Sequence, residues 1–268
     1  MKAVAFDYAR PATAAAARQL LAAAGGMAKL VAGGQSLGPM LNLRLAQPAS
    51  LVDLTALDAF ASVRDEGAAL FIGAGVTHAA IEDGRAADPS NGLMPEVAAN
   101  IAYRAVRNRG TLGGSLAHAD PAADWVSTMR VLDAVYLIEG RHGQREVASG
   151  DFMQAAFTTT LADDEVLTGV RIVKCSTSTK FGYYKYCRKV GEFAEAIACV
   201  LIDPQRNIKR AVIGATAGAP HLVHNIDAVL RGDAAAIAAE VRAAGCDEPY
   251  EFQMHTVALK RAVAQALK

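Results

Sequence analysis

The stretch RNRGTLGGSLAHADP, residues 107–121, decides the fold of this chain. A shorter stretch, AGGQSL at residues 32–37, repeats its central feature: a glycine pair that follows an apolar residue and precedes a hydroxyl side chain. Glycine pairs adopt positive φ angles and let another molecule touch the backbone, and consecutive N–H groups in such a turn form an anion-binding concavity. Ordinary turns are the alternative, because turns are where glycines usually occur. The matched pair indicates two loops that grip one pyrophosphate from both sides.

These two stretches, the longer one continued as RNRGTLGGSLAHADPAAD to residue 124, resemble the FAD-binding medium subunits of molybdenum hydroxylases. That family includes xanthine dehydrogenase, aerobic carbon monoxide dehydrogenase and nicotine dehydrogenase. The resemblance covers essentially the whole chain and is most specific at residues 107–124. It implies an α+β fold, in which a two-lobed PCMH-type FAD-binding domain over residues 1–175 precedes a smaller α+β C-terminal domain over residues 176–268. The lobes are expected at about residues 1–55 and 56–175.

The resemblance also implies that FAD lies between the two lobes, with both glycine loops on its pyrophosphate. In the family, the acid that matches Asp124 hydrogen-bonds the cofactor, and the apolar residue that matches Leu167 lies against the flavin ring. The lysine that matches Lys185 lies near the flavin, where a cation stabilises an anionic reduced ring. The cofactor-binding residues expected on this basis are Ala32, Gly33, Gly34, Gln35, Ser36, Thr111, Leu112, Gly113, Gly114, Ser115, Asp124, Leu167 and Lys185. The chain itself is expected to hold no catalytic acid or base and no metal ligand.

One segment departs from the family pattern. Residues 188–194 read RKVGEFA, where the family usually has glycine, aspartate and an aromatic residue. Glu192 replaces the aspartate, and Phe193 presents a phenyl ring in place of a phenol. Stacking of Phe193 on the flavin is therefore expected, without tuning by a hydroxyl group.

The resemblance implies a division of labour among subunits. A large molybdopterin subunit oxidises the substrate, and a small subunit with [2Fe–2S] clusters passes the electrons to FAD on this chain. An external acceptor such as NAD, quinone or oxygen then receives them, within an assembly expected to be a dimer of heterotrimers. Two alternatives are a stand-alone FAD oxidoreductase of the same fold superfamily and a redox-inert nucleotide-binding module. The first would need its own acid–base residue beside the flavin, and none is evident.

Composition sets broad limits on the protein. The 268 residues carry 27 basic and 27 acidic side chains, and no Lys/Arg-rich run indicates nucleic-acid binding. No stretch of about 18 apolar residues lacks a charge, so no transmembrane segment is expected. The four cysteines form no Cys-x-x-Cys motif, which argues against an iron–sulfur or zinc site made of cysteines. With no N-terminal pattern typical of a signal peptide, we expect reduced thiols in a cytoplasmic protein.

Other motifs are absent or ambiguous. The G-x-G-x-x-G, P-loop and G-x-S-x-G patterns do not occur, which argues against a Rossmann site, a P-loop nucleotidase and an α/β-hydrolase. His118 with Asp120 is interpreted as a loop anchor, and the pair at positions 221 and 224 as solvated histidines. The arginines at 107 and 109 either neutralise a phosphate or hold their loop through backbone carbonyls.

Periodicity and turn residues predict the secondary structure. Residues 107–120 are expected to form a loop, and the C-terminal domain a three-stranded antiparallel sheet followed by helices. The predicted strands are residues 3–6, 29–32, 51–54, 61–64, 68–73, 134–139, 146–148, 166–173, 181–188, 196–202 and 208–215. The predicted helices are residues 12–24, 79–83, 93–102, 227–230, 234–244 and 256–267, with further helices after Ser36 and Pro121.

Overall fold

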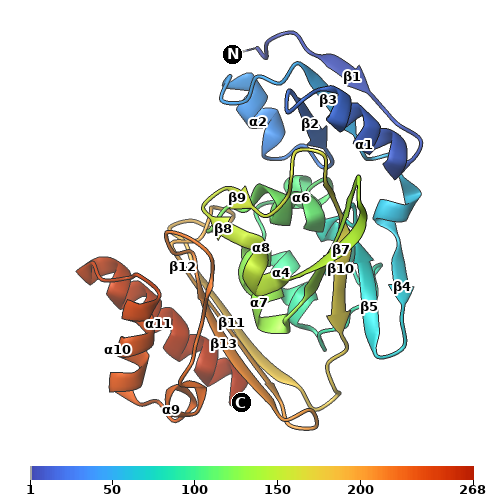
Figure 1. Ribbon diagram of the computed structural model, residues 1–268. Helices are drawn as coiled ribbons and strands as arrows, with labels where there is room; N and C mark the ends of the chain where they lie inside the picture. Colours follow the sequence, from blue (N-terminus) through green and yellow to red (C-terminus); the bar gives the residue numbers. More distant parts are fainter. Residues whose placement is uncertain (1) are drawn as a thin grey trace.

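Three larger β-sheets with helices packed against them, and one small sheet of two strands, make up the fold, and the computed structural model describes residues 2–268 (Figure 1). The first sheet lies at the top of Figure 1, the second in the middle and the third at the lower left. The α+β architecture predicted from the sequence is confirmed. None of the helices within residues 2–268 has the length and apolar character needed to cross a membrane.

The N-terminal lobe is a parallel three-stranded sheet with the order β1-β3-β2. Helix α1 begins after Thr13, whose hydroxyl accepts a hydrogen bond from the Ala16 N–H and so satisfies one free donor of the first turn. Helix α2 directly follows the glycine loop at residues 32–36, the first glycine loop in chain order; the loop at residues 111–115 is the second. The elements are β1 (Asp7–Ala9), α1 (Ala14–Ala23), β2 (Ala28–Val31), α2 (Leu37–Asn42) and β3 (Ser50–Asp53).

The predicted strand at residues 3–6 is wrong, since β1 begins at Asp7. Pairing with the central strand decides the position: Asp7 is opposite Ser50 and Ala9 is opposite Val52. The Tyr8 hydroxyl also donates a hydrogen bond to the Asp53 carboxylate at the end of β3. Cross-strand partners therefore selected a segment less apolar than its neighbour.

The second lobe is a five-stranded antiparallel sheet with the order β4-β5-β10-β6-β7. Its elements up to the second glycine loop are a 3₁₀-helix (Asp58–Ala61), β4 (Val63–Asp65), β5 (Ala69–Gly73), α3 (His78–Glu82), α4 (Leu93–Ala99) and α5 (Arg104–Arg107). The remaining elements are α6 (Leu112–His118), α7 (Asp124–Leu132), β6 (Val135–Gly140), β7 (Gly143–Ala148), α8 (Ser149–Phe152), β8 (Met153–Ala155), β9 (Thr158–Thr159) and β10 (Val166–Val173).

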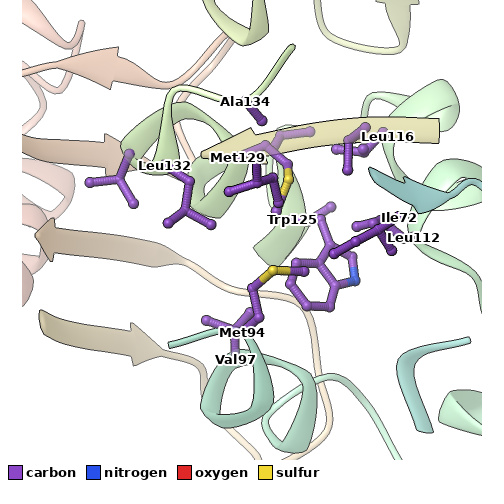
Figure 2. Close-up of a cluster of buried hydrophobic side chains, with 14 of the residues drawn as sticks. Ile72, Met94, Val97, Leu112, Leu116, Trp125, Met129, Leu132 and Ala134 are labelled. Carbon is purple, nitrogen blue, oxygen red and sulfur yellow. The ribbon is translucent and has the colours of Figure 1, made fainter. Parts of the chain in front are cut away.

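The core of this lobe surrounds Trp125, which is fully buried on α7 (Figure 2). Met94 and Val97 from α4 and Leu112 from α6 lie around its ring, and Met129 continues the same face of α7. Spacing of 125, 129 and 132 along the chain is that of one helical face. The predicted helix under the second glycine loop is therefore confirmed.

The expectation of a loop over residues 107–120 is wrong. Residues 112–118 form helix α6, and its N-cap Thr111 accepts a hydrogen bond from the Gly114 N–H. Two glycines in a first turn disfavour helix by propensity alone. They are retained because Gly113 lies against Ala74, where an added Cβ would be only 2.3 Å from the Ala74 Cβ. Tertiary packing thus overrides the turn signal.

The C-terminal sheet is antiparallel with the order β11-β12-β13-β14. The three predicted strands are present, and a two-residue fourth strand joins their edge at Ile213 and Val212 of β13. Successive residues of β12 point to opposite faces that are both covered, so its residues are apolar up to Asp203 at its end rather than alternating. The elements are β11 (Lys180–Tyr186), β12 (Ala196–Asp203), β13 (Ile208–Gly214), β14 (His221–Leu222), α9 (Ile226–Leu230), α10 (Ala234–Ala243) and α11 (Pro249–Ala266).

The two faces of this sheet belong to different cores. Ala196, Ala198 and Val200 pack with the C-terminal helices, whereas Ile197 and Cys199 pack with the core around Trp125. Helix α7 therefore lies between the second and third sheets. The division into domains at residue 175 stays a prediction, because a shared core crosses it.

Candidate cofactor-binding site

The two glycine loops meet at Gly33. A Cβ at this position would lie 2.1 Å from the Arg109 carbonyl oxygen and 2.8 Å from the Gly110 Cα. Only glycine permits two backbones to approach this closely. The first loop leaves β2, and the second leads from α5 into α6, so the contact joins the N-terminal lobe to the second lobe (Figure 1).

The first loop presents free backbone donors. Gly34 has a φ of 69°, a left-handed conformation that turns the chain toward α2. The N–H groups of Gln35 and Ser36 find no acceptor within residues 2–268. Gln35 uses its side-chain amide to donate to the Gly33 carbonyl at 3.0 Å, which steadies the turn. These N–H groups, with the exposed Ser36 hydroxyl, suit an anion.

The second loop differs from the expectation, because its N–H groups are already used. Leu112 donates to the Val76 carbonyl at 2.9 Å, and Gly113 donates to the Ala74 carbonyl at 2.8 Å. The Gly114 N–H is held by Thr111. What this loop offers a ligand is the half-buried Ser115 hydroxyl and the exposed backbone of Gly114, whereas the Thr111 hydroxyl is buried beneath them.

His78, which the sequence reasoning missed, positions the second loop. The backbone N–H of His78 donates to the Gly110 carbonyl at 2.9 Å, and the His78 ring lies directly against Gly110. On the other side, the Trp125 indole Nε1–H donates to His78 Nδ1 at 3.0 Å. Burial, together with the nearby Arg107 cation, lowers the pKa of His78 to about 4. The imidazole is therefore neutral and accepts from the indole.

This low pKa predicts a loss of stability in mild acid. Below the ordinary histidine pKa of 6.5, His78 is protonated in the unfolded chain, but in the folded chain it stays neutral down to about pH 4. Proton binding therefore favours the unfolded state in this pH range. We expect His78→Asn, whose amide oxygen can still accept from the indole, to remove this dependence. Between pH 7 and pH 4.5, the unfolding free energy of the wild type should fall by about 2 kcal/mol more than that of the variant. If urea titrations showed the same fall in unfolding free energy for the wild type and for His78→Asn, the assigned role of His78 would be contradicted.

Arg107 holds its loop, which decides between the two interpretations left open for it. Its guanidinium donates to the carbonyls of Ile101 and Ala102 and pairs with Glu82 at 2.8 Å. Arg109 is exposed and lends only its carbonyl to the contact with Gly33. His118 is expected from the sequence to anchor the same loop. In the structure its ring packs against Phe157, with 5.2 Å between the ring centroids.

Asp124 and Lys185, far apart in sequence, form a buried ion pair. Lys185 Nζ lies 3.0 Å from Asp124 Oδ2, and both side chains are less than a tenth exposed. The Tyr183 hydroxyl donates to the other carboxylate oxygen, and Asp124 opens helix α7, where the helix dipole favours an anion. Burial raises the pKa of the Asp124 carboxyl, while Lys185 and Tyr183 oppose the rise.

Exposed aromatic rings lie near this pair. Lys185 also donates to the Asn100 carbonyl at 3.3 Å, three residues before Tyr103, which is 53% exposed. Gly191 packs against the Tyr103 ring, and the same segment presents Phe193 at 65% exposure. Two uncovered rings, on segments next to the contacts of Lys185, suit a flat ligand.

Leu167 lies elsewhere in the lobe, on β10. It is buried in the core that also contains Leu112 and Leu116 of α6. A register shift between Leu167 and Gly169 interrupts the pairing of β10 with β6. Leu167 therefore packs on the core side of helix α6, and its contact with a flavin stays a prediction.

Together these residues fit a dinucleotide: a donor-rich loop junction for the diphosphate, and exposed rings beside a cation for the flavin. A family described as the FAD binding domain in molybdopterin dehydrogenase matches residues 4–173.

Similar proteins span the full length. The carbon monoxide dehydrogenase medium chain of Afipia carboxidovorans is 34% identical over 277 residues, which cover 97% of this chain and 96% of the relative. The 6-hydroxypseudooxynicotine dehydrogenase complex subunit alpha of Paenarthrobacter nicotinovorans is 31% identical over 284 residues, covering 100% and 96%.

Solved structures of related oxidoreductases match the fold over nearly the whole chain. A chain of reconstituted CO dehydrogenase from Oligotropha carboxidovorans matches with a TM-score of 0.90 and 32% identity, covering 99% of both chains. Quinoline 2-oxidoreductase from Pseudomonas putida 86 matches with a TM-score of 0.86 and 30% identity, covering 99% of this chain and 98% of the other. The chain belongs to the family of FAD-binding medium subunits of molybdenum hydroxylases, and is thus the flavoprotein subunit of an oxidoreductase.

Proposed function

We propose that this chain holds FAD across its glycine-loop junction and passes electrons from [2Fe–2S] clusters on a partner subunit to an external acceptor. The observation that carries the proposal is the contact at Gly33, which places the free N–H groups of Gln35 and Ser36 beside the second loop. When bound, FAD supplies a carrier that accepts electrons singly and releases them singly or in pairs.

The residues of the chain bind and orient the FAD, and none of them is assigned a proton transfer to a substrate. The N–H groups of Gln35 and Ser36, with the hydroxyls of Ser36 and Ser115, hold the diphosphate. The Lys185 ammonium, fixed by Asp124, provides positive charge at the ring site. Tyr103 and Phe193 cover the ring and keep water away from it.

The proposed partners are a small [2Fe–2S] subunit and a large molybdopterin subunit, assembled as a dimer of heterotrimers. The similarity to subunits of multi-subunit dehydrogenases supports partner subunits of some kind. A cytoplasmic location belongs to the same proposal, supported by four cysteines that are all free.

The test compares FAD with FMN on the flavin-free chain, followed by quenching of flavin fluorescence. We expect one FAD per chain and binding at least about tenfold tighter than FMN, because FMN lacks the diphosphate bridge and loses about one charge-assisted hydrogen bond or more. Equal affinities would contradict the assignment of the loop junction to the diphosphate.

A second experiment tests the electron path. Substrate should bleach the bound flavin only when both partner subunits are present. If the lone chain turned over a substrate, the stand-alone oxidoreductase would be the correct interpretation. If the chain bound FAD that no complex reduced, the redox-inert alternative would hold.

A further inference from the structure

A cluster of metal-ligating side chains lies in the C-terminal domain, on the edge of the sheet where β14 runs beside α10. His221 is on β14, His224 follows it, and Glu240 is on α10. One ligand atom from each residue lies within 4.8 Å of the others. The prediction of two solvated histidines is wrong for His221, whose side chain is only 14% exposed.

Glu240 is held in place as metal-binding carboxylates usually are. It is buried, and its Oε1 accepts hydrogen bonds from the backbone N–H groups of His224 and Asn225, at 3.1 and 2.7 Å. These bonds leave Oε2 directed at the two imidazoles, 2.8 Å from His221 Nε2 and 4.0 Å from His224 Nδ1. Backbone donors that orient a ligating carboxylate are the outer contacts that tune metal affinity.

The two rings approach the same oxygen from different directions. Their centroids are 5.3 Å apart and their planes are nearly perpendicular, so the rings meet edge to face and are not stacked. His224 is 79% exposed and gives a cation a path from solvent. A neutral imidazole can carry its proton on either nitrogen, so His221 can release Nε2 to a cation and keep the proton on Nδ1.

We propose that His221, His224 and Glu240 form a binding site for a divalent first-row transition-metal ion. Two imidazole nitrogens and one carboxylate oxygen are the donor set of three-residue zinc sites, with water in the fourth position. Such an ion ties the short edge strand β14 to α10. The site is separate from the residues proposed to hold the flavin, since it is built from β14, the loop after it and α10.

Zinc titration of the metal-free, untagged full chain by calorimetry tests the site. We expect one saturable Zn²⁺ per chain, no comparable binding of Mg²⁺ or Ca²⁺, and a melting temperature that rises with Zn²⁺. His224→Ala should weaken Zn²⁺ binding at least about tenfold. Because His224 is exposed, this variant is expected to fold normally.

Two further variants keep the result interpretable. Glu240→Gln retains an oxygen for the two backbone N–H groups but loses the ligating charge, and should also weaken Zn²⁺ binding at least about tenfold. His142→Ala is the control, because it removes an exposed histidine on the β6–β7 hairpin, and it should leave the affinity for Zn²⁺ unchanged. Absence of saturable Zn²⁺ binding, or equal affinity in wild type and His224→Ala, would overturn the proposal.

Discussion

Gly33→Ala is expected to lower the affinity for FAD by about 100-fold or more. The added Cβ would lie 2.1 Å from the Arg109 carbonyl oxygen, which belongs to the backbone and cannot swing aside as a flexible side chain can. The two loops must then separate. Separation takes the donors of Gln35 and Ser36 away from the hydroxyls of the second loop, and losing two hydrogen bonds to a charged group costs about 3 kcal/mol or more.

Gly38→Ala is the matched control, since it makes the same chemical change five positions away, where an added Cβ meets nothing within 4 Å. Alanine is also favoured over glycine inside helix α2. Flavin fluorescence titrations of both variants measure the effect, and urea unfolding of the flavin-free chains separates it from general destabilisation. A Gly33→Ala protein that bound FAD like the wild type would show that the loop junction is not the binding site.

The glycine motifs were readable from sequence because glycine is needed wherever backbones touch. The expectation that both loops form cups of free N–H groups holds only for the first loop. In the second loop, the carbonyls of Ala74 and Val76 take those N–H groups. Such partners come from another strand end, and no local pattern reveals them.

The same limit applies to the supporting side chains. Asp124 and Lys185 were identified only through the family likeness, and Tyr183 and His78 were missed. A buried tyrosine inside a strand and a histidine at the start of a short helix look like ordinary core residues. Their roles depend on contacts between distant segments, so periodicity finds the elements and leaves the hydrogen bonds between them unknown.

Strand ends were missed for a related reason. Residues 3–6 are more apolar than β1, but partner residues on β3 decide which segment pairs. Two-residue β14 is too short for any alternation to show, and it exists because β13 offers an edge. Long, mostly buried strands such as β10 and β12 were predicted correctly, because their eight positions carry enough apolar residues to define them.

Lys185→Met is expected to lower the free energy of unfolding of the flavin-free chain by about 3–5 kcal/mol, because it leaves the Asp124 carboxylate buried without its cation. Methionine keeps most of the length of the side chain, so loss of packing contributes little. Lys209→Met is the matched control: Lys209 pairs with Asp227 at 2.7 Å, but both side chains are at least half exposed. Breaking that surface pair should cost less than about 1 kcal/mol.

The double variant Asp124→Asn/Lys185→Met distinguishes loss of the charge pair from loss of shape. With both charges removed, most of the stability should return, since the Tyr183 hydroxyl can still donate to the amide oxygen. The deficit of Lys185→Met should also shrink as the pH falls. Burial already raises the Asp124 pKa, and without the cation the folded state takes up a proton before the unfolded state does. Urea titrations at about pH 8 and pH 5 measure this, and a deficit that stays constant with pH, or persists in the double variant, would mean that Lys185 stabilises the chain by packing rather than by its charge.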